Sequence, residues 1–173
     1  MGEDEDATVR MLIAHREVLT ALIQQNNGRV IDSPGDNMLA EFASVVDAVQ
    51  CAGAVQKEIK TRNDDLPENR RMQYRIGINL GDVIHEQDRV YGDGVNIAAR
   101  LESLCDGGGI CFSNAVYDQV KNKLDLVFEY QGEHRVKNIA EPVRVYRVLD
   151  EPGAGVSLTG KKKLSPVPES EPA

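Results

Sequence analysis

The chain has 173 residues and a formal net charge of −8, with 41% hydrophobic and 28% charged residues. This composition is typical of one soluble globular domain, and the acidic balance argues against a nucleic-acid-binding surface, which carries clustered lysine and arginine. No apolar run approaches the roughly 20 residues of a membrane span, and the acidic start MGEDEDATVR differs from a signal peptide. Three cysteines without a CxxC pair argue against a disulfide framework or a zinc site and fit a reducing cytoplasm.

The first part of the chain predicts two helices joined by a hairpin. Apolar residues at helical spacing indicate a helix from about residue 6 to residue 26, which the sequence Asn-Asn-Gly ends. Residues 28–42 are typical of a β-hairpin with a Pro-Gly-Asp turn at 34–36. A second helix is expected from residue 43 to about residue 62, although Gly53 lowers its helix propensity.

The middle of the chain predicts a second hairpin. Residues 74–78 alternate apolar and polar side chains, as a half-buried strand does. A Gly-Asp turn at 81–82 leads to Val83 and Ile84, which we expect to begin the partner strand.

The last part of the chain predicts more strands and a polar tail. Residues 107–120 indicate a strand and then a short helix capped by Ser113 or Asn114. Residues 126–149 predict strand, turn, strand, a bend at a proline and a last strand, and residues 151–173 read as a linker or disordered tail. We therefore expect one domain over residues 1–150, built as an α/β sandwich with a largely antiparallel sheet and packed helices.

The stretch VYGDGVNIAARLE, residues 90–102, places two glycines before an amphipathic helix. Its apolar stripe includes Leu101 and faces a core, whereas Asn96 and Arg100 are four residues apart and share a neighbouring face. Such a pair can be a solvated polar face behind an Asp93 N-cap. It can also lie beside a bound phosphate, because the first backbone N–H groups of a helix are free to donate.

Two other charged residues have an ordinary and a functional interpretation. Asp36 at the hairpin tip is either turn chemistry or a ligand of Mg²⁺, which prefers one or two carboxylates. Lys137, on or near a strand in the segment GEHRVKNIAEPV, is by itself an exposed lysine. Neither residue alone identifies a site.

A Gly-Asp hairpin, a helix with VNxxxR and the late segment VKNIAEPV together resemble the class III nucleotidyl cyclases, the adenylate and guanylate cyclase family. The resemblance covers roughly residues 7–148. It implies a ferredoxin-like α/β (α+β) cyclase fold and a head-to-tail homodimer with shared active sites. It also implies ATP or GTP as substrate and two Mg²⁺ or Mn²⁺ ions. In the implied reaction the ribose 3′-hydroxyl attacks the α-phosphorus and releases pyrophosphate, for second-messenger signalling under the control of attached domains.

The resemblance assigns a role to four residues. Asp36 matches the second of two metal-binding aspartates, and Lys137 matches the lysine that binds the terminal phosphates. Asn96 matches the asparagine that orients the ribose. Arg100 matches the arginine that stabilises charge on the α-phosphate. These matches predict catalysis by positioning and charge neutralisation.

The sequence departs from the family at the first metal-binding aspartate, which lies in the family on a strand directly before the first helix. This sequence starts at about that helix, and the acidic run at residues 3–6 is a poor substitute. We therefore expect the N-terminal strand to be missing, one metal carboxylate to remain and turnover to be slow or absent. The alternative function is a non-catalytic cyclase-homology domain for dimerisation or nucleotide binding. An unrelated ferredoxin-like scaffold is a third hypothesis.

The base-reading positions also depart from the family. Adenylate cyclases have lysine and aspartate there and guanylate cyclases glutamate and cysteine, whereas this chain has Asp32 and Arg89. One interpretation is a salt bridge between the two. The other is guanine recognition, in which Asp32 accepts from N1–H and the 2-amino group while Arg89 donates to O6. A shift by one residue would place Asp88 at the second position instead.

Overall fold

A computed structural model of the chain describes residues 2–32, 37–81, 84–86, 89–124, 126–137 and 139–149. The chain divides into two compact units, Met1–Gln73 (unit 1) and Tyr74–Ala173 (unit 2). The expected tail at 151–173 lies outside the described residues. No helix in the described ranges has the length and apolar content that crossing a membrane requires.

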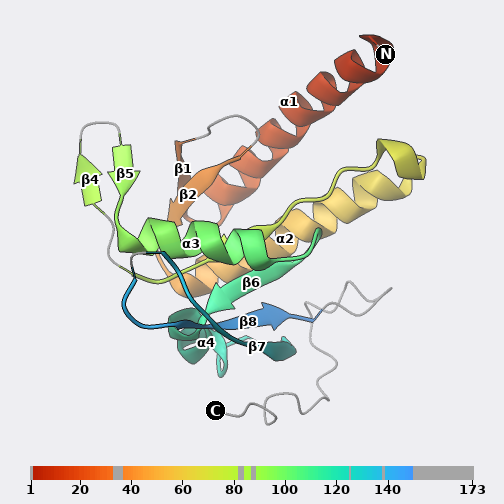
Figure 1. The fold of residues 1–173 in the computed structure, drawn as a ribbon. Coiled ribbons are helices and arrows are strands. Elements are labelled where there is room, and N and C mark those ends of the chain that lie inside the picture. The colour runs from red at the N-terminus through yellow and green to blue at the C-terminus, as the bar shows by residue number, and fades with distance from the viewer. Residues whose placement is uncertain are drawn as a thin grey trace. The chain divides into compact units, whose positions relative to one another are not determined.

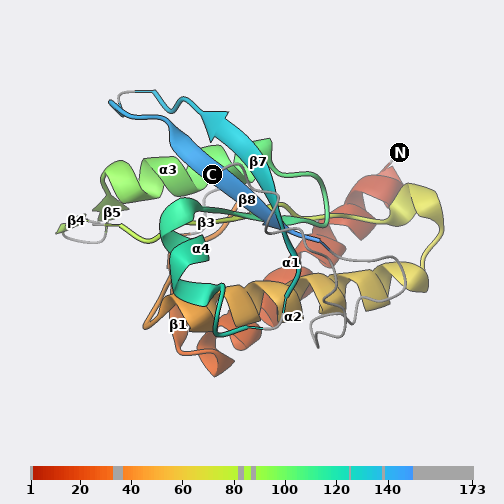
Figure 2. The same ribbon diagram turned by 90° about the horizontal axis from the view of Figure 1, so that it is seen from below.

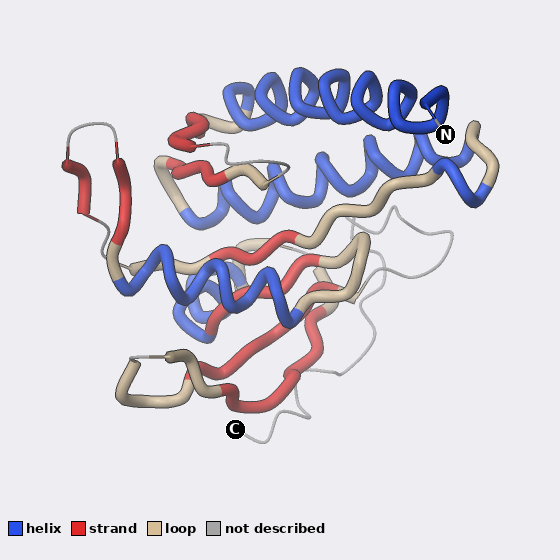
Figure 3. Tube along the Cα trace, turned by 45° about the horizontal axis from the view of Figure 1, so that its top comes forward, coloured by secondary structure: helices blue, strands red, loops and turns tan. Residues whose placement is uncertain are grey.

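Unit 1 contains two helices and a β-hairpin between them. Its elements in chain order are α1 (Gly2–Gln25), β1 (Gly28–Asp32), β2 (Leu39–Phe42), α2 (Val45–Asp64) and a short 3₁₀ helix (Glu68–Arg70). β1 and β2 pair antiparallel, and α1 contacts α2. Figure 3 shows the two helices side by side, with the hairpin at the end where α1 stops and α2 starts. Both predicted helices and the predicted hairpin are confirmed, while its turn at 34–36 lies outside the described residues.

Helix α2 is held at both ends by polar side chains. Ser44 is its N-cap and accepts a hydrogen bond from the Asp47 N–H at 3.1 Å, which satisfies a free donor of the first turn. Near the other end, Asn63 is 8% exposed, and its Nδ2 donates to Met72 O at 2.8 Å while its Oδ1 accepts from Met72 N at 3.2 Å. Gly53 does not interrupt the helix, since it is buried and tertiary packing overrides its low propensity.

Unit 2 is built on a four-stranded mixed sheet in the order β3-β6-β8-β7. Its strands are β3 (Ile76–Ile78), β6 (Ile110–Ser113), β7 (Phe128–His134) and β8 (Val143–Val148). β3 and β6 are parallel, whereas the other two pairs are antiparallel, and Figure 2 shows β7 and β8 side by side. The remaining elements are β4 (Ile84–Glu86), β5 (Arg89–Tyr91), α3 (Asp93–Leu104) and α4 (Asn114–Val120). The expected α/β class and predominance of antiparallel pairing are confirmed.

The predicted hairpin between residues 74–78 and a strand from Val83 is wrong. β3 pairs in parallel with β6, and β4 pairs antiparallel with β5 in a separate hairpin that extends from the start of α3 (Figure 1). A parallel pair needs a crossover connection of about a dozen residues or more, and the segment that contains α3 provides one. All four residues of β6 are buried, so this pairing places β3 beside the core of the sheet.

Gly77 lets α3 lie directly on the sheet. It forms one row across the strands with Cys111, Arg147 and Glu129, so these residues share one face. A Cβ added at Gly77 would lie 2.5 Å from the carbonyl oxygen of Ala98 in α3 and would also clash with a second backbone atom of that helix. Only glycine therefore permits this helix-to-strand contact.

We expect Gly77→Ala to lower the free energy of unfolding by about 2 kcal/mol or more, because the obstacle is backbone that cannot rotate away. Gly132→Ala is the control. Its added Cβ meets nothing within 4 Å, and its φ of 92° costs alanine about 1 kcal/mol of backbone strain. Urea unfolding of both variants measures the difference. A loss for Gly77→Ala no greater than that for Gly132→Ala would contradict the expected clash with the backbone of α3.

The core between α3 and the sheet contains two of the three cysteines. Leu101, Cys105, Cys111 and Val145 form a buried cluster, against which Ile97, Leu104 and Val143 pack. The predicted apolar stripe of α3 is therefore confirmed. All three cysteines are buried free thiols, and burial raises the pKa of the Cys51 thiol in α2 to about 11.

The opposite face of the sheet has an aromatic core. Tyr117 of α4 stacks on Tyr146 at a centroid distance of 4.0 Å and meets the edge of Phe128 at 5.6 Å. Phe112, 0% exposed, meets Phe128 at 5.5 Å. α3 and α4 therefore cover opposite faces of the sheet (Figure 1).

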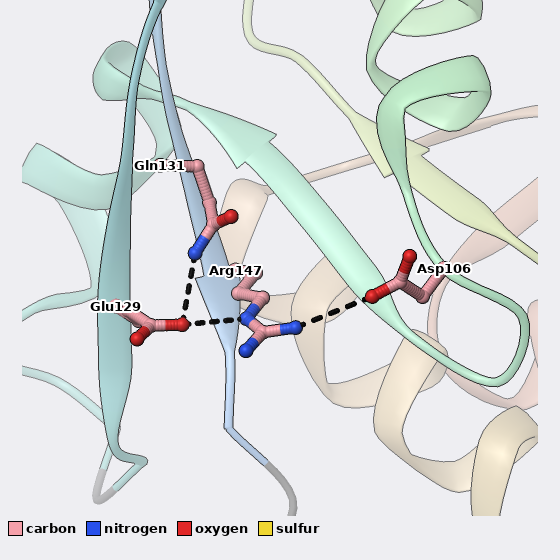
Figure 4. A network of polar contacts seen from close by, with 4 residues as sticks. All are labelled: Asp106, Glu129, Gln131 and Arg147. Atoms are coloured by element: carbon pink, nitrogen blue, oxygen red, sulfur yellow. Dashed lines mark hydrogen bonds and ion pairs between the residues drawn. The ribbon is translucent and has the colours of Figure 1, made fainter.

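A polar network ties the loop after α3 to the edge of the sheet (Figure 4). Arg147 Nε lies 2.7 Å from Glu129 Oε1, and its Nη1 lies 3.4 Å from Asp106 Oδ2. Gln131 Nε2 donates to the same Glu129 oxygen at 2.9 Å. Because Asp106 and Arg147 are substantially exposed, each pair contributes roughly 1 kcal/mol at most, and the network mainly fixes the position of the loop.

Candidate functional site

The start of α3 is shaped by a glycine instead of a capping side chain. Gly92 is the N-cap, has φ 127° and makes no side-chain cap hydrogen bond. Its carbonyl oxygen accepts from the N–H groups of Val95 and Asn96, both at 3.1 Å. The interpretation of Asp93 as N-cap is therefore wrong by one residue. Asp93 is the first helical residue, where a carboxylate interacts favourably with the helix dipole.

Asn96 and Arg100 lie on the exposed side of α3, while Leu101 on the other side is buried. The helix is regular over this stretch, so the spacing of four residues places both polar groups on one face. Arg100 is further fixed at its backbone, because Ser103 Oγ donates to its carbonyl oxygen at 2.8 Å. An amide and a guanidinium in this position can contact a ligand outside the helix.

The other predicted residues lie elsewhere or outside the described part. Lys137 is exposed in the connection between β7 and β8. Asp36 and Asp88 lie outside the described residues. Asp32 is the last residue of β1 and Arg89 the first of β5, but their side chains are not among the described ones, so the roles assigned to them stay predictions.

A pocket of about 860 Å³ opens at the carboxyl ends of β3 and β6, where α3 and α4 begin. Its volume is in the range of small-molecule sites. It is lined by segments far apart in the sequence, namely 79–81, 92–94 with Ile97, 113–115, Glu133 and 141–144. Asn96, Arg100 and Lys137 do not belong to the lining, although the pocket adjoins the first turn of α3.

Two hydrogen bonds in series connect the carboxyl ends of β3 and β6 to α3. Ser113 was predicted as a helix cap and does stand at the N-cap of α4, but its hydroxyl makes no cap hydrogen bond. It donates instead to Asn79 Oδ1 at 2.7 Å, and Asn79 Nδ2 donates to Gly94 O at 3.2 Å. Asn79 was not predicted from the sequence, where its only signal is its place directly after a strand, two residues beyond Gly77.

The metal site implied by the resemblance is not formed by the described residues alone. Within the described ranges, no three histidine, cysteine, aspartate or glutamate residues lie together in a way that could hold a metal ion. The predicted ligand Asp36 lies outside those ranges.

The sequence is similar to known proteins over most of its length. The sequence profile of the family described as "Adenylate and Guanylate cyclase catalytic domain" matches residues 3–150. The chain is 44% identical over 147 residues to "Putative adenylate cyclase 3" of Rhizobium meliloti, covering 84% of this chain and 25% of that protein. It is 26% identical to "Serine/threonine-protein kinase pkn2" of Myxococcus xanthus, over 84% of this chain and 17% of that protein. The chain thus spans a quarter or less of these two relatives.

The fold is similar to solved structures. The "Adenylate/Guanylate Cyclase/Hydrolase" of Silicibacter pomeroyi superposes with a TM-score of 0.81 at 36% sequence identity, over 86% of this chain and 88% of that one. The adenylyl cyclase CyaB of P. aeruginosa superposes with a TM-score of 0.67 at 22% identity, over 83% of each chain. At that identity the second match supports the fold alone.

Proposed function

Because the chain belongs to the adenylate and guanylate cyclase catalytic domain family, we propose that it converts a purine nucleoside triphosphate into the 3′,5′-cyclic monophosphate and pyrophosphate, for second-messenger signalling. The family is one of lyases that make cyclic nucleotides. The observation that carries the proposal is the pair Asn96 and Arg100 on the exposed side of α3, directly after the glycine entry at Gly92.

Each of three described residues has one task in the proposed reaction. Asn96 orients the ribose so that its 3′-hydroxyl faces the α-phosphorus. Arg100 lies one turn further along and stabilises the charge that develops on the α-phosphate, because its guanidinium stays cationic and can donate two parallel hydrogen bonds. Lys137 binds the terminal phosphates as a point charge. The Mg²⁺ or Mn²⁺ ions of the family would add charge neutralisation, and we assign Asp36 as one of their ligands.

A homodimer is part of the proposal. An exposed amide and guanidinium catalyse well only where water is excluded, because the low dielectric of a closed site strengthens their interaction with phosphate. A second copy of the chain placed against the exposed side of α3 would close the site and share it.

A related rhodopsin-guanylyl cyclase with converted specificity was solved in complex with ATPαS. This complex supports a nucleoside triphosphate as the ligand of the chain.

We also propose that residues 1–150 form the catalytic domain and that residues 151–173 connect it to another part of a longer protein. The relatives are several times longer than the matched region, which supports attached regulatory domains. The cysteine content and the signalling role fit a cytoplasmic location.

The test is an assay of cyclic nucleotide formation from ATP and from GTP with Mg²⁺ or Mn²⁺. Two proteins are compared: the 173-residue chain, and the same chain preceded by a strand that bears an aspartate as in the family (the extended chain). We expect the extended chain to form a cyclic nucleotide and pyrophosphate. Nucleotide binding without product in both proteins would contradict catalysis and favour the non-catalytic dimerisation or nucleotide-binding module.

The same assay decides the base. If Asp32 and Arg89 read guanine, kcat/KM for GTP should exceed that for ATP by about tenfold or more, because adenine would place its unprotonated N1 against the Asp32 carboxylate. The similarity to a protein named as an adenylate cyclase supports ATP instead. Equal or better use of ATP would contradict guanine recognition by these two residues and leave the salt bridge as their role.

A further inference from the structure

The hydrogen bonds between Ser113, Asn79 and Gly94 form a bracket behind the helix that carries Asn96 and Arg100. Ser113 is the last residue of β6, and Asn79 directly follows β3. Since the two strands are parallel neighbours, both residues lie at the same end of the sheet, where the strands finish. Gly94, in the first turn of α3, is buried and receives the outer hydrogen bond. The bracket therefore joins the sheet to the start of α3 through side chains.

The Gly94 carbonyl oxygen sets the orientation of the Asn79 amide, and the Ser113 hydroxyl holds its other end. Ser113 is 4% exposed, and its Oγ donates to Asn79 Oδ1 at 2.7 Å. The Asn79 Nδ2 then faces Gly94 O at 3.2 Å. The opposite orientation of the amide would put its oxygen against the Gly94 carbonyl oxygen, two acceptors with no proton between them. The chain of donors and acceptors thus has one satisfied arrangement.

The N-terminal end of α3 contains two glycines. Gly92 offers no capping side chain, and glycine at Gly92 and Gly94 leaves the backbone with more freedom than other residues would. Gly81 packs closely on the bracket, since a Cβ there would lie 3.2 Å from Asn79 Nδ2. Asn79 therefore fixes the first turn by donating to a helix carbonyl oxygen, whereas an N-cap side chain would accept from a free N–H.

We propose that Asn79, held by the Ser113 hydroxyl, is a positioning residue that sets the direction of the first turn of α3 and thereby aims Asn96 and Arg100 at the nucleotide. This inference rests on the proposed cyclase function. Asn96 follows Gly94 by two residues, so a small displacement of the turn passes directly to its amide. A displacement of about 1 Å in a reacting pair can cost on the order of a hundredfold in rate.

The test compares Asn79→Ala with Asn63→Ala. Asn63 is a matched control, because its amide also makes two hydrogen bonds and is largely buried, but it lies in unit 1 and contacts the backbone of Met72. Both variants should lose similar stability in urea unfolding. In the extended chain, Asn79→Ala should lower kcat about tenfold or more with KM changed less than about threefold. Asn63→Ala should leave both constants near those of the parent.

Ser113 variants test the direction of the bracket. Ser113→Ala should lower kcat in the same direction as Asn79→Ala, and the double variant should be no slower than Asn79→Ala, because both act through one amide. Ser113→Thr keeps the hydroxyl and should restore most of the rate. Additive losses in the double variant, or a kcat of Asn79→Ala as high as that of Asn63→Ala, would overturn the proposal.

Hydrogen exchange separates failure of this inference from failure of the proposed function. In the 173-residue chain, Asn79→Ala should speed amide exchange in the first turn of α3, and Asn63→Ala should not. If the extended chain makes no cyclic nucleotide at all, the proposed function fails, and the bracket is judged by this exchange alone. Unchanged exchange at the first turn of α3 in Asn79→Ala would overturn it in either case.

Discussion

Replacing Arg100 with alanine should lower kcat of the extended chain by about a hundredfold to a thousandfold, the range seen when one donor to a transition-state oxyanion is removed. KM for the nucleotide should change little, because in the proposed reaction the guanidinium meets charge that develops only as the α-phosphorus reacts. The exposed position of Arg100 means that the substitution leaves the buried side of α3 intact.

The measurement is steady-state kinetics with the better of the two nucleotides. Arg62→Ala is a suitable control, since Arg62 is also a partly exposed arginine on a helix and its partner is Glu58 at 2.8 Å. It should leave kcat unchanged. A variant at Arg100 that mainly raised KM would show that the side chain binds the ground state and would remove its proposed role in the transition state.

Replacing Asp36 with alanine should abolish metal-dependent turnover, the largest loss that we expect from any single substitution. A hard divalent cation needs carboxylate oxygens, and the resemblance assigns one of the two aspartates to this position. The rate of cyclic nucleotide formation by the extended chain and its variants is measured against Mg²⁺ and Mn²⁺ concentration. Asp36→Asn should shift the metal dependence to higher concentration, since an amide oxygen is a weaker ligand than a carboxylate.

Asp64→Ala controls for the loss of one surface carboxylate, because Asp64 pairs with Lys60 at 3.8 Å on the exposed side of α2. Its metal dependence should equal that of the parent. Full turnover of Asp36→Ala at ordinary Mg²⁺ concentration would exclude Asp36 from the metal site and call for another carboxylate.

The features that could be predicted from the sequence are those that depend on the local spacing of apolar and polar residues. The spacing of Leu101 against Asn96 and Arg100 determines which side of α3 is buried, because a helix repeats every 3.6 residues wherever it lies. The strand at 76–78 was likewise visible as alternation. Its partner was not, since both a hairpin and a crossover were consistent with the sequence, and the choice depended on the buried strand β6 beyond α3.

The parts of the site that could not be predicted are assembled from distant segments. Ser113 carries a strong local signal for capping, yet its hydroxyl finds Asn79, which is 34 residues away in the sequence. The pocket is similar, because its lining comes from five separate segments that meet only when β3, β6 and β8 form a sheet. Asp32, Arg89 and Asp36 rest on the resemblance alone.

Because all three thiols are buried, their labelling can report local unfolding of the structure around each of them. Cys51 lies in unit 1 and is 2% exposed, while Cys105 and Cys111 lie in unit 2 at 5% and 3%. A thiol reagent modifies a buried cysteine only as fast as the surrounding structure opens. The rate at which each thiol is labelled in the unmodified sequence therefore reports whether the two units unfold together or one before the other.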